Sequence, residues 1–205
     1  MIRKLLLCFL ILSFAVCGAD ASLTASQIVA KASQRITRAG SVTAGFRYSG
    51  GGQSGLGTLK ASGKKFIVET PGMSSWYNGK NLWTYSAASR ETTVVTPTSG
   101  ELAETNPLTY MTSASASFTF SFGRGDSPVR RIIVLTPKSR KLGVKGVILE
   151  LEGKTLNPLK IIVRGGDGSV STIVITKFQL GKGLPASNFE YPKNKYPKIK
   201  IIDLR

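Results

Sequence analysis

Two short strings in this chain have residue types that could do chemistry. Residues 50–55, GGGQSG, fit the pattern G-x-G-x-x-G, whose glycines let the backbone approach a dinucleotide phosphate where a strand passes into a helix. Residues 62–65, SGKK, fit S-x-x-K, in which the serine is a nucleophile. Strand-like residues flank the first string, and the partner motifs of Ser-Lys enzymes do not accompany the second. We therefore interpret both strings as turns.

The residue types that catalysis needs are otherwise scarce. The chain has no histidine, which removes the commonest general base and most zinc sites. Glu150 and Glu152 could act as a carboxylate pair, but their alternation with Leu149 and Leu151 favours the solvated face of a strand. We expect no enzyme activity, no metal site and no cofactor.

The first 21 residues have the form of a secretory signal peptide. Arg3 and Lys4 precede an apolar run over residues 5–16, and Ala19 and Ala21 are the small residues that a signal peptidase requires. The apolar run is shorter than the roughly 20 residues that cross a bilayer as a helix. We expect cleavage after Ala21 and export of the rest of the chain.

The rest of the chain, residues 22–205, is predicted to be one domain. Its length is sufficient for an ordinary hydrophobic core. Both cysteines, Cys8 and Cys17, fall in the predicted signal peptide, so the mature domain has no disulfide to stabilise it. We expect a monomer.

The chain is strongly basic, with 28 Lys and Arg residues, 11 Asp and Glu residues and a formal net charge of +17. A positive field attracts anionic lipid head groups and acidic proteins. Nucleic acid is not the expected partner, because the protein is exported and has no nucleic-acid recognition motif. The excess of lysine could equally serve only to keep an apolar sheet soluble.

The spacing of apolar residues predicts an α+β fold made mostly of antiparallel strands. A helix is expected over residues 22–39, capped by Thr24 or Ser26, and a second helical element over residues 98–112. Between and after them the apolar residues alternate, which is typical of strands joined by short turns. The predicted strands are 42–49, 55–61, 64–70, 74–78, 81–86, 90–96, 117–123, 129–136, 145–152, 158–164 and 170–180, followed by an extended C-terminal stretch.

The apolar faces of these strands indicate a curved sheet with helices on its concave side. Phe118, Phe120 and Phe122 alternate with hydroxyl residues, so one face of that strand is buried and the other is wet. Residues 132–135 are apolar on both faces, which implies cover on both sides of the sheet.

A set of apolar residues is predicted to line the concave side of the sheet, although a register error of one residue would exchange the two faces. The predicted lining is Phe46, Phe66, Val68, Trp83, Tyr85, Leu149, Ile161, Val163, Ile173 and Ile175, with Leu108 and Met111 on the covering helix. Each of these residues could instead be plain core.

The C-terminal stretch carries four lysines among aromatic and apolar residues. They are Lys193, Lys195, Lys198 and Lys200. Such a strip could contact an anionic membrane surface or a partner. An edge strand that lysines and prolines protect from aggregation would have the same composition.

Several short strings, taken in order, resemble the LolA family of outer-membrane lipoprotein carriers. The strings are residues 41–46 (SVTAGF), 57–59 (GTL), 65–66 (KF), 78–85 (NGKNLWTY), 106–108 (NPL), 134–137 (VLTP), 167–168 (DG) and 188–189 (NF). The resemblance runs over essentially the whole mature sequence, and the string GKNLWTY is the most specific part.

The resemblance implies an incomplete, open antiparallel β-barrel of about eleven strands whose concave face is covered by helices. It also implies a periplasmic function: the concave residues named above form a ligand cavity that carries lipoprotein acyl chains, or a related lipid, from an inner-membrane transporter to an outer-membrane receptor. One departure concerns the lid, because family members commonly have Arg-Pro where this chain has Lys60, Ala61 and Ser62. The alternative function is a lipid or lipoprotein sensor on the same scaffold that does not transport its ligand.

Overall fold

One sheet makes up most of the protein. The computed structural model describes residues 22–205, so the predicted signal peptide at residues 1–21 lies outside the described residues. The strands follow the order β12-β6-β5-β4-β3-β2-β1-β11-β10-β9-β8-β7. They are β1 (Ser41–Gly50), β2 (Gln53–Ser62), β3 (Lys65–Thr70), β4 (Met73–Tyr77), β5 (Leu82–Ser86), β6 (Glu91–Val95), β7 (Phe118–Phe122), β8 (Arg130–Pro137), β9 (Val144–Glu152), β10 (Pro158–Gly165), β11 (Val170–Gly181) and β12 (Lys200–Asp203).

Three α-helices and four short 3-10 helices complete the described part of the chain. They are α1 (Ala25–Ala39), α2 (Ser99–Thr105), α3 (Thr109–Thr112), η1 (Ala114–Ala116), η2 (Arg140–Leu142), η3 (Ala186–Phe189) and η4 (Lys193–Lys195). Thr24 caps α1 through a reciprocal pair of hydrogen bonds with Gln27. Among residues 22–205, no helix is long and apolar enough to pass through a membrane.

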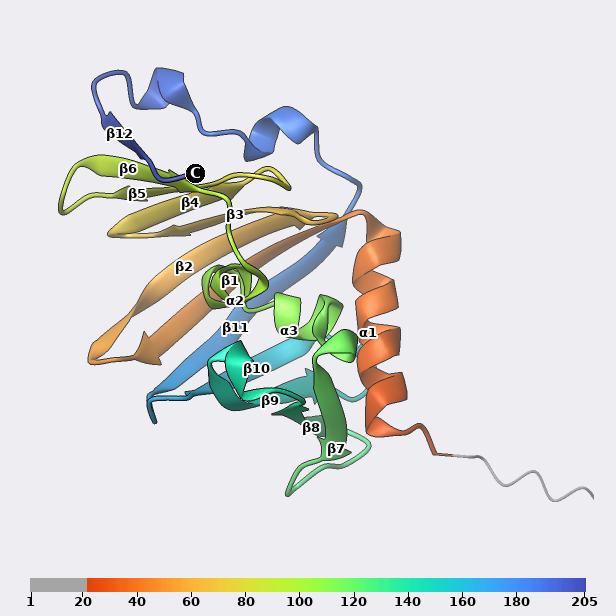
Figure 1. Ribbon diagram of the computed structural model, residues 1–205. Helices are drawn as coiled ribbons and strands as arrows, with labels where there is room; N and C mark the ends of the chain where they lie inside the picture. The colour runs from red at the N-terminus through yellow and green to blue at the C-terminus, as the bar shows by residue number, and fades with distance from the viewer. Residues whose placement is uncertain (1–21) are drawn as a thin grey trace, which may run out of the picture.

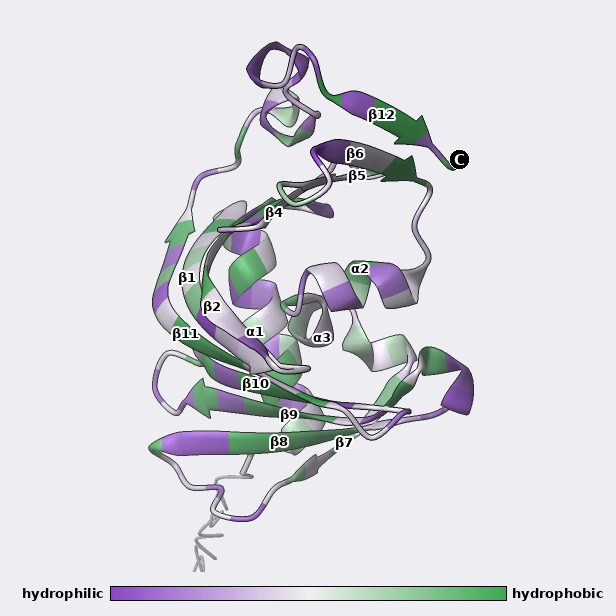
Figure 2. Ribbon diagram, turned by 90° about the vertical axis from the view of Figure 1, so that its left-hand side faces the viewer, coloured by the Kyte–Doolittle hydropathy of each residue, from purple (hydrophilic) through white to green (hydrophobic). Residues whose placement is uncertain are grey.

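The sheet curls into an open half-barrel, and α1, α2 and α3 lie on its concave side (Figures 1 and 2). The predicted fold class is confirmed. The sheet has twelve strands where about eleven were expected, because β12 adds to the edge strand β6. This last pair is parallel, and the other pairs are antiparallel.

Both strings that suggested chemistry are turns, as predicted. Gly51 and Gly52 form the tip of the β1–β2 hairpin with φ of 57° and 76°, a left-handed conformation that glycine adopts without steric cost. The second string is the β2–β3 hairpin, where the Ser62 hydroxyl donates a hydrogen bond to the carbonyl oxygen of Gly40 (2.8 Å). Ser62 is therefore committed to a structural contact.

The main hydrophobic core lies between the concave face and the helices. Its completely buried side chains come from adjacent strands of one half of the sheet: Ile133, Leu135, Val147, Leu149, Leu151 and Ile161. In the other half, the ring of Phe46 lies over Gly57, where an added Cβ would be only 2.3 Å from a ring carbon. Glycine at position 57 therefore leaves the space that Phe46 fills.

A second apolar cluster lies on the opposite face of β4, β5 and β6. Residues 186–203, here called the C-terminal segment, contain η3, η4 and β12. Figure 2 shows this segment crossing that side of the half-barrel, away from α2. The Trp76 ring meets Tyr191 at 5.5 Å and Tyr196 at 5.8 Å between ring centroids, both edge-on. Thr92 donates a buried hydrogen bond to the Tyr191 hydroxyl oxygen (3.1 Å). The C-terminal segment is thus fixed to the sheet by aromatic packing.

This cluster predicts unequal effects for the two tryptophans. Trp76→Ala should lower the free energy of unfolding by about 3 kcal/mol, because Trp76 is 3% exposed and its loss leaves a cavity under the C-terminal segment. Trp83→Ala, on the same face and only half-buried, should cost less than half as much. Urea denaturation of both variants measures the difference, and equal losses would contradict the placement of the C-terminal segment.

Candidate functional site

A helical segment fills the middle of the concave side. Residues 98–113, here called the covering segment, contain α2 and α3. Leu108, Tyr110 and Met111 are buried in the core, and Leu102 and Ala103 pack against it partly exposed. The covering segment is therefore the part of the chain that closes the concavity.

The covering segment makes its hydrogen bonds internally. Within the described chain, each hydrogen bond of residues 98–113 joins two residues of that same segment. Thr98 caps α2, and its hydrogen bond to Glu101 lowers the pKa of that carboxyl group. No hydrogen bond or ion pair among residues 22–205 ties the covering segment to the sheet, so apolar contact holds it there.

The larger cavity beside the covering segment has a volume of about 510 Å³. It lies between the end of α1, the start of β1, the β2–β3 hairpin and the covering segment. Pockets for small ligands commonly measure roughly 300–1,000 Å³. Its apolar lining is Ile36, Val42, Ala61, Phe66 and Leu102, and its polar lining includes Lys64, Tyr77, Asn106 and several hydroxyl residues.

A smaller cavity of about 370 Å³ lies on the other side of the covering segment. Val163 and Ile173 form part of its wall, and Glu104 and Asp167 contribute carboxylates. Tyr110 also lines it; burial raises the pKa of this phenol, and the charge of Glu104 raises it further. The two cavities thus differ in the charge of their linings.

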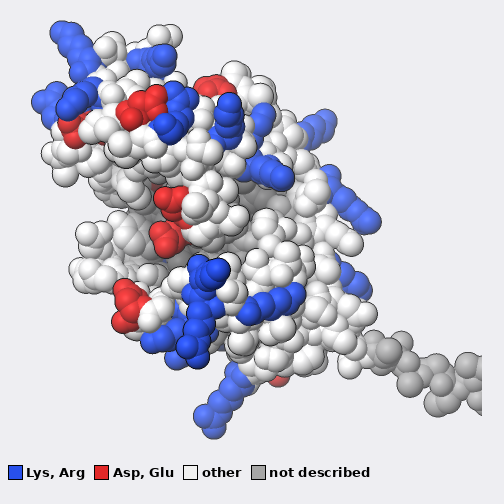
Figure 3. Space-filling model, in the orientation of Figure 1, with Lys and Arg blue, Asp and Glu red and all other residues white. Residues whose placement is uncertain are grey.

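A third hollow, of about 420 Å³, is a groove between α1 and the chain from α3 to β7. Met111, Ala114 and Phe120 supply its apolar floor, and Gln27 and Gln34 lie along α1 at its side. On the face of the molecule drawn in Figure 3, basic side chains surround a hollow that contains acidic ones. The concave side is therefore partly open.

Most of the residues predicted to line a cavity are on the concave side. Phe66 lines the larger cavity, Val163 and Ile173 line the smaller one, and Met111 lines the groove. The others belong to the core or pack against it without lining these hollows: Phe46, Val68, Leu108, Leu149, Ile161 and Ile175. Their role in binding a ligand stays a prediction.

The expected position of Trp83 and Tyr85 is wrong. Trp83 is paired with Trp76, so both project from the convex face, and the Tyr85 ring lies 4.7 Å from that of Tyr196 in the aromatic cluster. The concave side of the same hairpin is formed by Tyr77 and Leu82. The error is the one-residue exchange of faces that alternation permits.

Lys60 does not take the place of the family's lid arginine. It is exposed and is paired with Thr43 and Ile67, on the face opposite its neighbours Leu59 and Ala61, which pack into or against the core. Its side chain therefore projects from the convex face and cannot reach the covering segment.

The four C-terminal lysines are all exposed. Lys193 and Lys195 belong to η4, and Lys195 lies 5.8 Å from the centroid of the Tyr196 ring. Lys200 begins β12 and forms an ion pair with Glu91 (3.4 Å). An edge strand with lysines is therefore present, and a contact with a membrane or partner stays a prediction.

The sequence analysis did not identify four residues of the larger cavity that matter most for its chemistry: Ala61, Lys64, Tyr77 and Asn106. The aromatic residues of the C-terminal stretch could have indicated Tyr77. They need an apolar surface, which the Trp76 face of β4 provides, so the neighbouring Tyr77 has to project to the concave side. Lys64 and Asn106 lie at a turn and a helix end, where alternation gives no signal.

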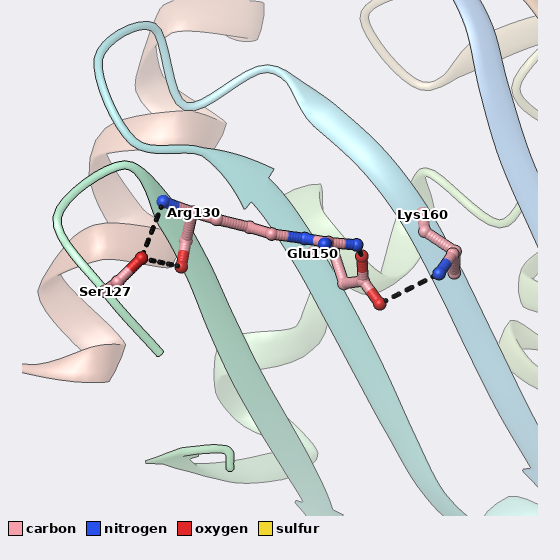
Figure 4. A network of polar contacts seen from close by, with 4 residues as sticks. All are labelled: Ser127, Arg130, Glu150 and Lys160. Carbon is pink, nitrogen blue, oxygen red and sulfur yellow. Dashed lines mark hydrogen bonds and ion pairs between the residues drawn. The ribbon is translucent and has the colours of Figure 1, made fainter. Parts of the chain in front are cut away.

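One polar network outside the concave side is structural. Glu150 is 8% exposed and lies between Arg130 and Lys160 on neighbouring strands of the convex face (Figure 4). Arg130 donates to one carboxylate oxygen, and Lys160 Nζ donates to the other (3.1 Å). Burial raises the pKa of Glu150, but the hydrogen bonds and charges of both bases outweigh it, so the pKa lies below its ordinary value.

This network does not form part of a metal site in the part of the chain that the structure describes. Residues 22–205 contain no group of three or more Asp, Glu, Cys or His side chains placed to hold a metal ion. What the concave side offers is an apolar surface, hollows and a cover attached without polar bonds.

Comparison with known families agrees with this architecture. Residues 15–167, well over half of the chain, match the family described as outer membrane lipoprotein carrier protein LolA. The chain belongs to the LolA family. No curated protein matches it.

Solved structures resemble the LolA-like chain at low sequence identity. An uncharacterized conserved protein from Thermus thermophilus has a TM-score of 0.56 and 14% identity, covering 87% of this chain and 98% of that one. A LolA superfamily protein from Nitrosomonas europaea has a TM-score of 0.43 and 16% identity, covering 83% and 99%. The Thermus structure supports the fold.

The Glu150 network predicts a pH-dependent contribution to stability. Because the folded pKa of Glu150 lies below the ordinary value of 4.5, its carboxylate stabilises the fold above that value, and the contribution is lost as the pH falls through the folded pKa. Glu150→Gln should lower the free energy of unfolding by about 1 kcal/mol at pH 7, since solvent weakens the exposed Arg130 contact. Below pH 4.5 the difference should shrink.

Urea denaturation at a series of pH values measures this effect. Glu69→Gln is the matched control, because Glu69 takes part in none of the ion pairs of residues 22–205. A loss for Glu150→Gln that stays constant with pH, or equals that of the control, would contradict the assignment.

Proposed function

We propose that this protein is a periplasmic carrier that holds acyl chains of lipoproteins, or of a related lipid, between the covering segment and the concave face. The observation that carries the proposal is the attachment of residues 98–113 by apolar contact alone, with cavities of about 510 and 370 Å³ on its two sides. Membership in a lipoprotein carrier family supports the same function. Binding without bond-making chemistry also fits the residues present.

Because apolar contact holds the covering segment in place, an acyl chain can displace it from the concave face more easily than water can. Exposing Leu108, Tyr110 and Met111 to water would cost about 1.5–3 kcal/mol for each side chain. An acyl chain offers these residues the same kind of contact that the sheet does, and no hydrogen bond has to break first. Opening of the covering segment is thereby coupled to loading.

Release is possible for the same reason. Each buried methylene group gains about 0.8 kcal/mol relative to water, so a bound chain does not escape into the aqueous phase. A bilayer is as apolar as the cavity, and transfer between the two is close to neutral. Small differences in how the covering segment packs can then set the direction of transfer.

The surfaces outside the cavity fit contact with membranes and partners. The exposed Lys193, Lys195 and Lys198 are placed to approach anionic lipid head groups or an acidic partner. An inner-membrane transporter as donor and an outer-membrane receptor as acceptor complete the proposed route, with residues 1–21 as the cleaved export signal and residues 22–205 as one binding domain.

A sensor that binds the same ligand without moving it would have the same cavity. The two functions differ in transfer: a carrier moves an acylated lipopeptide from donor vesicles to acceptor vesicles, and a sensor retains it. A fluorescently labelled lipopeptide with two vesicle populations separates them.

A substitution that fills the larger cavity should weaken uptake. Ala61→Phe places a ring where about two methylene groups of ligand would lie, so binding of a palmitoylated lipopeptide should fall about tenfold. Lys60→Phe adds the same ring on the convex face and is the matched control. Binding is measured by titration after lipid removal, with thermal melting to establish that both variants fold. Equal binding by both variants would count against the cavity.

The covering segment should also exchange amide hydrogens faster than the core strands. Its hydrogen bonds are internal to two short helices, whereas those of β8 belong to the middle of a sheet. Hydrogen-exchange mass spectrometry of the lipid-free protein should show early exchange in residues 99–112, and loading with lipopeptide should change it. If residues 99–112 exchange as slowly as β8 and the ligand does not change their exchange, the covering segment is not a movable cover.

A further inference from the structure

Three hydrogen-bond donors belong to residues that line the larger cavity, and no hydrogen bond within residues 22–205 uses them. They are the Lys64 ammonium, the Tyr77 hydroxyl and the side-chain amide nitrogen of Asn106. Lys64 is exposed on the β2–β3 hairpin and takes part in none of the ion pairs of residues 22–205. The larger cavity therefore has polar groups in its lining that an acyl chain alone does not need.

Two of the donors belong to side chains that are more than nine-tenths buried. Tyr77 is 8% exposed and packs against Phe66 at 5.3 Å between ring centroids, and none of the hydrogen bonds within residues 22–205 uses its hydroxyl group. Asn106 is 6% exposed, and its Oδ1 accepts from the Leu108 amide (3.1 Å), which leaves Nδ2 available. Neither the Tyr77 hydroxyl oxygen nor Asn106 Nδ2 is among the fully buried side-chain atoms of residues 22–205 that have no partner, so both donors are open to the cavity and accessible to a ligand.

The charge of the lining points in the same direction. No Asp or Glu side chain is among the residues that line the larger cavity, whereas Glu104 and Asp167 line the smaller one. A ligand group that meets a positive charge and two neutral donors, and no carboxylate, should itself be an anionic acceptor. A cationic head group would find a positive charge and no anion to balance its own.

We propose that the larger cavity recognises an amphiphile with an anionic oxygen head group, either a carboxylate or a phosphate, on a single hydrocarbon chain. The head group lies at Lys64, Tyr77 and Asn106, and the chain follows Val42, Phe66 and Leu102 beneath the covering segment. This inference rests on the proposed function and names its ligand class.

The test compares amphiphiles that share one chain and differ in the head group. Laurate, dodecyl phosphate, dodecanol and dodecylamine are titrated, below their micelle concentrations, into the exported protein after lipid removal. We expect laurate and dodecyl phosphate to bind about tenfold more tightly than dodecylamine. The affinity of dodecanol should lie between that of the anions and that of dodecylamine. The relative affinities of laurate and dodecyl phosphate identify which anion the cavity prefers.

Matched charge reversals separate the cavity from the overall positive field. Lys64→Glu should weaken laurate binding roughly five- to tenfold and strengthen dodecylamine binding. Lys65→Glu makes the same change in net charge at the next residue, whose side chain is not part of the lining, and should leave the order of affinities unchanged. Tyr77→Phe removes one oxygen atom and should weaken laurate about tenfold without affecting dodecanol to the same degree.

The outcomes distinguish this inference from the proposed function. Equal binding of all four amphiphiles, or equal effects of Lys64→Glu and Lys65→Glu, would overturn the head-group site and leave acyl-chain binding intact. Failure of every amphiphile and of the palmitoylated lipopeptide to bind would overturn the proposed function itself.

Discussion

The structure depends on how the concave face is covered. A sheet with one apolar face has to bury that face, and here α1 and the covering segment at residues 98–113 do so. The covering segment satisfies its own backbone through short helices and an N-terminal cap at Thr98, so it needs nothing polar from the sheet. The same property that completes the core also makes the cover replaceable by another apolar surface. In the proposed carrier, stability and ligand access would therefore be set by one interaction, the apolar contact of the cover with the sheet and α1.

The two faces of the half-barrel are stabilised by different kinds of contact. On the convex side, the C-terminal segment is fixed over β4–β6 by packed aromatic rings and by a buried hydrogen bond between Thr92 and Tyr191. On β8–β10, the convex face is fixed by charged hydrogen bonds from Arg130 and Lys160 to Glu150. Directional contacts thus stabilise the outside of the sheet, and non-directional ones close the inside. In the proposed carrier, such an arrangement would let the cover move while the curvature of the sheet is maintained.

The sequence predicts the fold better than the site. Alternation and turn residues place the eleven delimited strands within about two residues of their observed ends, because hairpins such as that at Gly51 and Gly52 need local signals only.

The concave face of β4 and β5 cannot be recognised locally, because it depends on residues more than a hundred positions away. Trp83 and Tyr85 make the convex face of this hairpin strongly apolar. The packing of Tyr196 on that face explains why Trp83 and Tyr85 are not in the cavity. Lys64 and Asn106 escape prediction for another reason: they lie at a turn and a helix end, where chain direction and not periodicity brings them together.

In the proposed carrier, the placement of the donors in the larger cavity would link binding of the ligand head group to closure of the covering segment. Lys64 and Tyr77 belong to the β2–β3 turn and to β4, which move with the sheet, whereas Asn106 lies between α2 and α3 in the covering segment. An acceptor held by all three would join the cover to the sheet by a polar contact, of which residues 22–205 themselves have none. A ligand with an apolar chain and no acceptor would replace the apolar contacts of the covering segment, but it would not join that segment to the sheet by hydrogen bonds. The cavity can thereby favour closure over one class of amphiphile, since only the interaction that differs between the open and closed states shifts the balance between them.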